Sequence, residues 1–145
     1  METKEKTKIS IEVRLNIPLN KAWDVWTKPE HIVNWNFASE DWQCPKAEVD
    51  LRVGGKFTSR MEAKDGSFGF DFSGEFDKIK AKELLEYTLE DGRKVKVEFR
   101  EESAETIVNE SFEPENENPL DMQRQGWQMI LNNYKKYAET LKSSL

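Results

Sequence analysis

Hydrophobic and polar residues alternate along most of this chain, which is the pattern of strands that bury one face. The first alternating stretch runs from Ile9 to Ile17 and ends at Pro18. Glycine-containing turns punctuate the later alternating stretches, which cover residues 47–53, 57–61, 68–76, 85–89, 95–99 and 105–112. The pattern predicts one strand near the start of the chain and then about six antiparallel strands, several of them joined by tight turns.

One of these strands is unusually aromatic. Phe68, Phe70, Phe72 and Phe76 occupy alternate positions, and Gly74 holds the remaining position on the same face. All four rings should therefore share one side of the sheet. Two interpretations are open: the four rings fill the core, or Phe70 and Phe72 also line a cavity.

Two short helices are predicted between residues 20 and 36. Asn20 is a candidate cap for the first helix, and Thr27 and Glu30 have the spacing of a capping box for the second. The inner positions of both helices are taken by Trp23, Trp26, Ile32 and Trp35. Residues 36–45 show no period, so we expect a loop there.

A long amphipathic helix is predicted over residues 120–141. Asn118 is its candidate cap, Pro119 its first residue, and Asp121 lies in its first turn. Two residues interrupt the apolar face, because Gln123 lies inside it and Gly126 at its edge. The face itself consists of Leu120, Trp127, Ile130, Leu131, Tyr134, Tyr137, Ala138 and Leu141.

The predicted order of elements is typical of an α+β domain. A sheet with one apolar face needs a cover, and the last helix is the only element large enough to supply it. A strongly curved antiparallel sheet closed over one helix leaves space between them. We expect a single domain over residues 8–145 and a flexible tail over residues 1–7, whose Lys, Glu and Thr side chains offer nothing to bury.

Composition excludes several classes of protein. The net charge is −6 and the pI is near 5.0, which argues against a nucleic-acid partner. Cys44 is the one cysteine, so an internal disulfide is excluded and a reducing compartment is favoured. No apolar signal region is present, and no stretch approaches the roughly 18 apolar residues of a membrane span. We therefore expect a cytoplasmic protein without membrane insertion.

Several motifs resemble those of a known family: VWTKPEHIVNW (25–35), AEVDLRVGGKF (47–57), SGEF (73–76), EYTLEDG (86–92) and RQGWQMIL (124–131). Together with the order of elements, they resemble the START/SRPBCC helix-grip superfamily, and within it the single-domain relatives of the activator of heat-shock protein 90 ATPase. The resemblance implies a helix-grip fold with a cavity between the sheet and the last helix. It leaves the activity open, because this superfamily hosts carriers, receptors and cyclases.

The leading hypothesis is a non-catalytic protein that binds an apolar small molecule, lipid-like or planar. Its contact area would come from side chains that face the cavity: Phe57, Met61, Phe70, Phe72, Tyr87, Trp127, Leu131 and Tyr134. An aromatic gate would involve Trp35, Phe37, Trp42 and Trp127, and the small Ser59 is a weaker candidate. No cofactor is predicted, and the pattern does not indicate an oligomeric state.

Two polar residues are candidates for orienting the ligand by hydrogen bonds. Gln123 either faces water in the first turn of the last helix or serves as a handle at the mouth of the pocket. Glu110 lies between Val108 and Phe112 on one strand face, and we expect it at the rim. If Glu110 is buried instead, desolvation should raise its pKa unless a cation pairs with it. Arg60 could be that cation only if the predicted strand faces are shifted by one residue.

Two other functions remain open. One is a stress-response interaction module that contacts the chaperone, although no segment matches a second domain of the activator. The other is a cavity enzyme of the cyclase or hydrolase type, with Glu110, His31 and tyrosines as its only acid–base candidates. No HExxH, CxxC, Walker, GxGxxG or GxSxG motif occurs, so we predict neither a metal site nor catalytic residues. His31 is expected to be exposed, and a Cys44–His31 nucleophile pair is disfavoured.

Overall fold

A computed structural model describes residues 8–141, so the tail predicted for residues 1–7 lies outside the described residues. The chain forms three helices and seven strands within that range. Their bounds, in chain order, are β1 (Ile9–Leu15), α1 (Leu19–Thr27), α2 (Pro29–Ile32), β2 (Trp42–Val49), β3 (Lys56–Ala63), β4 (Gly69–Lys80), β5 (Leu84–Leu89), β6 (Lys94–Glu102), β7 (Glu105–Phe112) and α3 (Leu120–Thr140).

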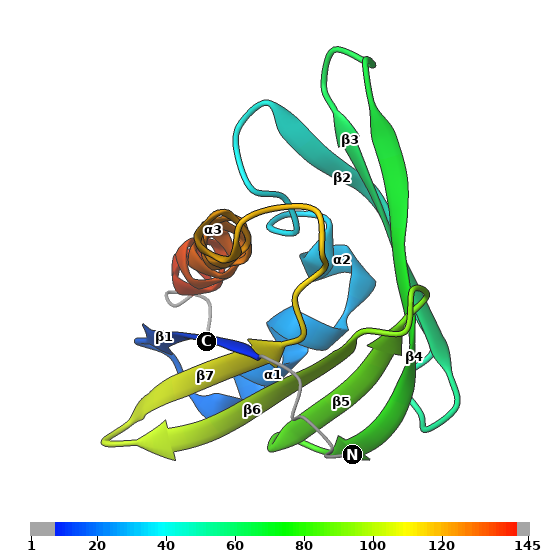
Figure 1. The fold of residues 1–145 in the computed structure, drawn as a ribbon. Coiled ribbons are helices and arrows are strands. Elements are labelled where there is room, and N and C mark those ends of the chain that lie inside the picture. The colour runs from blue at the N-terminus through cyan, green and yellow to red at the C-terminus, as the bar shows by residue number, and fades with distance from the viewer. Residues whose placement is uncertain (1–7, 142–145) are drawn as a thin grey trace, which may run out of the picture.

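The strands form one antiparallel sheet in the order β1-β7-β6-β5-β4-β3-β2. Figure 1 shows the sheet curving around α3, with β1 and β7 on one side of the helix and β2 and β3 on the other. α1 packs against α3, β6 and β7, and α2 packs against β2. The α+β helix-grip fold that the sequence predicts is therefore confirmed.

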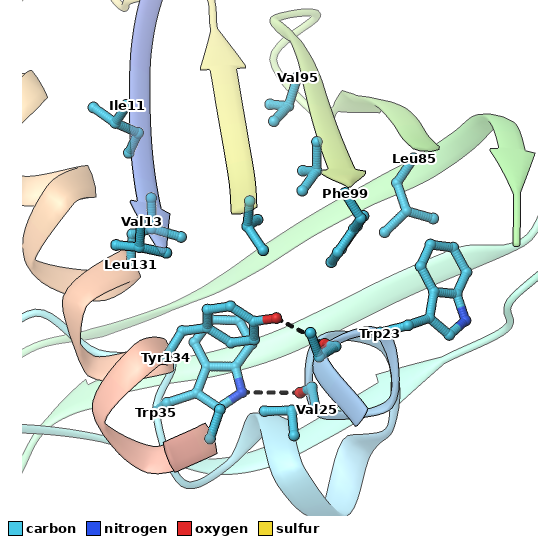
Figure 2. Close-up of a cluster of buried hydrophobic side chains, with 14 of the residues drawn as sticks. Ile11, Val13, Trp23, Val25, Trp35, Leu85, Val95, Phe99, Leu131 and Tyr134 are labelled. Atoms are coloured by element: carbon cyan, nitrogen blue, oxygen red, sulfur yellow. Dashed lines mark hydrogen bonds between the residues drawn. The ribbon is translucent and has the colours of Figure 1, made fainter. Parts of the chain in front are cut away.

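The core lies between the concave face of the sheet and the helices. β1 shows the predicted alternation, because each of its apolar residues is buried and each polar residue between them is exposed. Figure 2 shows how α3 is tied to α1 through this core. The Tyr134 hydroxyl donates to the Ala22 carbonyl at 2.7 Å, and Trp35 Nε1 donates to the Val25 carbonyl at 3.0 Å. The Trp35 and Tyr134 rings lie edge to face at 5.0 Å.

The predicted bounds of the second strand were wrong at both ends. β2 begins at Trp42, inside the segment expected to be a loop, because the backbone there pairs with β3 up to Ala63. β2 also stops at Val49, so Leu51 and Val53 lie outside the sheet with 40% and 63% of their surfaces exposed. Residues 50–55 instead form a turn that is held by its own backbone hydrogen bonds and by hydrogen bonds to β4.

None of the predicted side-chain caps of the two short helices forms. α1 begins at Leu19, one residue before the expected cap Asn20, and no side chain caps it. The hydroxyl of Thr27 donates to the Trp23 carbonyl at 2.9 Å and therefore stays within α1. Lys28 is the residue that precedes α2, and it has no capping hydrogen bond either. Packing of the buried tryptophans therefore stabilises these two helices in place of the predicted side-chain caps.

The phenylalanine strand extends beyond the part of the sheet that α3 covers. Phe76 is buried, whereas Phe70 is 41% exposed and Phe68, which precedes β4, is 61% exposed. Trp42 contacts both exposed rings, with centroid distances of 5.9 and 6.2 Å. The interpretation that all four rings fill the core is therefore wrong. We call Trp42, Phe68 and Phe70 the aromatic tip. Within residues 8–141, no helix has the length and apolarity needed to cross a membrane.

Candidate ligand-binding cavity

A cavity of about 250 Å³ lies between the concave face of the sheet and the helices. Its walls come from the three helices, from strands β2 to β5 and β7, and from the segments that follow α2 and precede β6. Most of its lining side chains are apolar or aromatic, as in typical small-molecule sites. They are Trp26, Thr27, Ile32, Trp35, Asn36, Val49, Phe57, Ser59, Met61, Phe70, Phe72, Phe76, Leu85, Tyr87, Arg93, Glu110, Trp127, Ile130 and Leu131.

Most of the residues that the sequence nominated line this cavity. The structure brings together Trp35, Phe57, Ser59, Met61, Phe70, Phe72, Tyr87, Glu110, Trp127 and Leu131. Aromatic contacts order the walls. Phe57 packs edge to face on Tyr87 at 4.8 Å, and Trp127 stacks on Phe112 at 3.8 Å. Phe72 reaches Trp127 across the gap between β4 and α3, at 6.2 Å.

Four nominated residues, Phe37, Trp42, Gln123 and Tyr134, are absent from the cavity wall. Tyr134 is fully buried in the core behind the wall, where its hydroxyl is bound to α1. Trp42 belongs to the aromatic tip. The carbonyl of Phe37 accepts a hydrogen bond from the Asn133 side chain, which ties the loop after α2 to α3. The predicted aromatic gate is therefore reduced to Trp35 and Trp127 at the wall.

Gln123 is buried and holds the loop between β7 and α3. Its Oε1 accepts from the Glu115 backbone N–H at 2.9 Å. Its Nε2 donates to the carbonyls of Glu115 and Asn118 at 3.1 and 2.8 Å. Both amide hydrogens are thus donated to backbone carbonyls. Gln123 therefore neither faces water nor offers a free amide to a ligand at the pocket mouth, which were the two predicted alternatives. Pro119 precedes the first residue of α3, and the side chain of Asn118 donates to Glu115 instead of capping the helix.

Glu110 is buried, and the expected position at the rim was wrong. Only 6% of its surface is exposed, because β7 carries it on the concave face between Val108 and Phe112. Burial raises its pKa from 4.5 to about 8. Arg60 does not pair with Glu110, since its guanidinium binds Glu62 and Asp71.

Glu110 and Tyr87 both present an oxygen without a protein partner to the cavity. No hydrogen bond joins the Glu110 carboxyl or the Tyr87 hydroxyl to another described residue. Every fully enclosed side-chain nitrogen or oxygen among the described residues does have such a partner. The oxygens of Glu110 and Tyr87 therefore open onto the cavity that both residues line. Burial, and secondarily the charge of Glu110, raise the pKa of Tyr87 well above its ordinary value.

Arg93 is the most consequential lining residue that the sequence reading missed. Arg93 immediately precedes β6, and alternation from Val95 and Val97 extends back to it and places it on the inward face. Its Nε donates to Asp91 at 2.8 Å, and its guanidinium also interacts electrostatically with Glu115. The other lining residues that were not nominated are Trp26, Thr27, Ile32, Asn36, Val49, Phe76, Leu85 and Ile130.

Residues 16–139 match the family described as Activator of Hsp90 ATPase homolog 1-like protein. The chain belongs to this family. Among solved structures, the AHSA1-like protein from Aeromonas hydrophila is 43% identical over 92% of this chain and 93% of its own, with a TM-score of 0.88. A protein from Cytophaga hutchinsonii is 47% identical over 92% of each chain, with a TM-score of 0.80.

More distant structures share the fold of this AHSA1-like chain. A protein from Nitrosomonas europaea is 19% identical over 97% of this chain and 99% of its own, with a TM-score of 0.81. At that identity the likeness concerns the architecture alone. No curated protein matches the chain. The family and the fold are therefore established.

Cys44 and His31 of this AHSA1-like chain do not form a reactive pair. The Cys44 thiol is buried and donates to the Lys46 carbonyl at 3.5 Å, and burial raises its pKa. His31 is partly buried, where exposure was expected, because its Nδ1 is hydrogen bonded to the Tyr137 hydroxyl at 2.8 Å. Each group is engaged in its own local contact, so neither is poised for nucleophilic chemistry.

The two glycines that the sequence analysis singled out have different surroundings. A Cβ on Gly74 would lie 2.8 Å from the Phe57 ring and from the Thr88 carbonyl, so the absence of a side chain lets that ring pack against β4. A Cβ on Gly126 would meet no atom within 4 Å. Gly126 therefore does not serve close packing of α3, and it does not line the cavity either.

We expect Gly126→Ala to raise the free energy of unfolding by about 1 kcal/mol, because alanine is the better helix former and space is available. Urea denaturation of the variant and the wild type measures this difference. Gly74→Ala is the matched control, and it should destabilise the fold because its Cβ would collide with Phe57 and the backbone. A destabilised Gly126→Ala variant would show that α3 requires glycine for a reason other than space.

Proposed function

We propose that this protein is a non-catalytic binding protein for a small, mostly apolar molecule, enclosed between the sheet and α3. One observation carries the proposal: a cavity of about 250 Å³ is walled largely by aromatic side chains and is lined by Glu110 and Tyr87, whose side-chain oxygens have no hydrogen-bond partner among the described residues. If side chains filled the space between the sheet and α3 completely, no ligand could enter it. Polar groups left unpaired in such a site gain hydrogen bonds when a ligand enters.

The binding energy would come chiefly from apolar burial. Burial contributes about 25 cal/mol for each Å² of apolar surface, before the costs of association reduce it. Phe57, Phe72 and Trp127 would supply flat contact surfaces, and Leu131 and Met61 would close the remaining wall. These walls suit a planar or lipid-like ligand. Among the described residues, Glu110 is the one acidic side chain that lines the cavity, and we propose no reaction there.

Contact with a protein partner is a second candidate function. The specific observation in its favour is the aromatic tip, whose rings Phe68 and Phe70 are exposed on the surface. The family description names an activator of a chaperone ATPase, so heat-shock protein 90 is the natural partner to test. A stress-linked role would follow from such a contact. We also propose a cytoplasmic location, where the thiol of Cys44 would remain reduced.

A titration with the neutral apolar dye N-phenyl-1-naphthylamine tests the binding function. We expect amide chemical-shift changes to cluster around the cavity, near Phe72, Trp127 and Leu131, with dye fluorescence increasing on binding. Ser59→Leu should raise the dissociation constant of the dye by at least about tenfold, because the larger side chain occupies the cavity that Ser59 lines.

Thr58→Leu is the matched control for the titration, because Thr58 precedes Ser59 in β3 and points to the opposite face. It should bind the dye as the wild type does. Equal binding by Ser59→Leu and the wild type would contradict an interior site. If the dye changes no amide chemical shift around the cavity, and the chaperone changes the shift of Phe68, the interaction function is favoured instead.

A further inference from the structure

The two unpartnered polar groups of the cavity lie close together on the sheet. Leu85, Val97 and Glu110 form one row across β5, β6 and β7. Tyr87 belongs to the adjacent row on the same concave face, where it pairs with Val95. Its electrostatic interaction with Glu110 reflects this proximity. A ligand in the cavity therefore meets a carboxyl and a phenol on one wall.

The surroundings of Glu110 favour its neutral form. With a pKa of about 8, it is largely protonated at pH 7 and carries an O–H that can donate. The other ionisable groups that line the same cavity are Tyr87 from β5 and Arg93 from the turn before β6. From α1 and α3, the lining side chains are tryptophan, threonine, isoleucine and leucine, none of which titrates.

We propose that Glu110 in its protonated form, assisted by the Tyr87 hydroxyl, receives a neutral oxygen acceptor of the ligand, such as the carbonyl of a ketone or an ester. This inference rests on the proposed binding function and names the class of ligand. Both groups donate an O–H, and a carbonyl oxygen is the complementary acceptor. The ligand is therefore an apolar molecule that carries a carbonyl, rather than a pure hydrocarbon.

Arg93 argues against the other complement of a carboxyl, an amine. A cationic ligand would need Glu110 in its ionised form, and it would enter a cavity whose one lining cation is already Arg93. Arg93 pairs with Asp91 through Nε and also interacts electrostatically with Glu115, so its charge is only partly balanced by these two groups. Like charges repel at short range in a site of low dielectric constant. A neutral acceptor avoids both costs.

The proposal gives a definite pH dependence. A carbonyl binds the protonated form of Glu110, so its affinity is full below the pKa of about 8. Above that pH, each unit should raise the dissociation constant by up to about tenfold, because a proton has to be taken up for binding. A hydrocarbon of the same shape lacks the acceptor, and its affinity should fall much less.

The experiment compares 2-acetylnaphthalene with 2-isopropylnaphthalene, in which a methyl group replaces the carbonyl oxygen. We expect the ketone to bind the wild type about five- to tenfold more tightly at pH 6.5, the worth of one net hydrogen bond. Calorimetry at pH 9, in two buffers of different ionisation enthalpy, should show proton uptake with the ketone. Glu110→Leu should abolish the preference, and Glu110→Gln should retain it without the pH dependence.

Glu98→Gln is the matched control, because Glu98 lies in β6 with its side chain on the outer, exposed face. It should keep both the preference and its pH dependence. Equal affinity of the wild type for the two compounds would overturn the carbonyl assignment while leaving the binding function intact. Tighter binding of 2-naphthylmethylamine than of the ketone would also overturn it. If N-phenyl-1-naphthylamine binds but neither naphthalene does, only this inference fails. If none of the three compounds binds, the binding function and this inference fail together.

Discussion

Glu110→Gln is expected to raise the free energy of unfolding by about 3 kcal/mol at pH 7. The physical reason is the cost of burying a group that ionises readily in water. The pKa of Glu110 is about 8 in the folded protein and 4.5 as its ordinary value. Between these two values the folded state holds a proton that the unfolded state releases, so the folded wild type loses stability as the pH rises.

The sign and range of this effect follow from proton binding. Below pH 4.5 both states are protonated and Glu110 carries no penalty. From there to about pH 8, stability should fall by about 1.4 kcal/mol per pH unit, and above pH 8 it should change no further on account of Glu110. Glutamine resembles the protonated acid at every pH, so the variant and the wild type should agree near pH 4.

Urea denaturation at intervals between pH 4 and pH 9 measures the prediction. The difference between Glu110→Gln and the wild type should grow with pH, whereas the surface control Glu98→Gln should follow the wild-type curve. A constant difference across this range would show that Glu110 is solvated in the folded state. Such a result would also remove the basis for a protonated ligand-binding group.

Gln123→Ala is expected to lower the free energy of unfolding by about 3 kcal/mol. Its amide makes three hydrogen bonds to the backbone of residues 115–118. Without them, the Glu115 N–H and two carbonyls lose their partner, and each buried unpaired polar group costs about 1–3 kcal/mol unless water reaches it. The loop between β7 and α3 should loosen, and the Glu115 amide should exchange its hydrogen faster.

Thermal or urea denaturation together with amide exchange tests this role. Gln125→Ala is the matched control, because it makes the same change two residues along α3 at an exposed position. It should stay within about 0.5 kcal/mol of the wild type. If Gln123→Ala is as stable as Gln125→Ala but loses affinity for N-phenyl-1-naphthylamine, Gln123 acts on the ligand and the loop-holding role is wrong.

The resemblance of local motifs and the period of apolar residues were enough to predict the architecture. Alternation identifies β1 and β5 to β7, since each buries one face against the helices. Local chemistry was a poorer guide to element ends. Asn20, Thr27 and Asn118 have the side chains of caps, yet none caps a helix, because neighbouring carbonyls or carboxylates and the packing of tryptophans satisfy those positions instead.

Periods that are local to each strand or helix were sufficient to predict the order of elements, the inward face of most strands and the aromatic character of the wall. Which of the inward residues line the cavity depends instead on contacts between elements that are far apart in the chain. Glu110 became a buried acid, Arg93 a wall residue and Gln123 a loop clamp, because the curvature of the sheet sets the depth of each position relative to α3. Phe68 and Phe70 have the same period as Phe76, yet they stay exposed next to Trp42, near the start of β4.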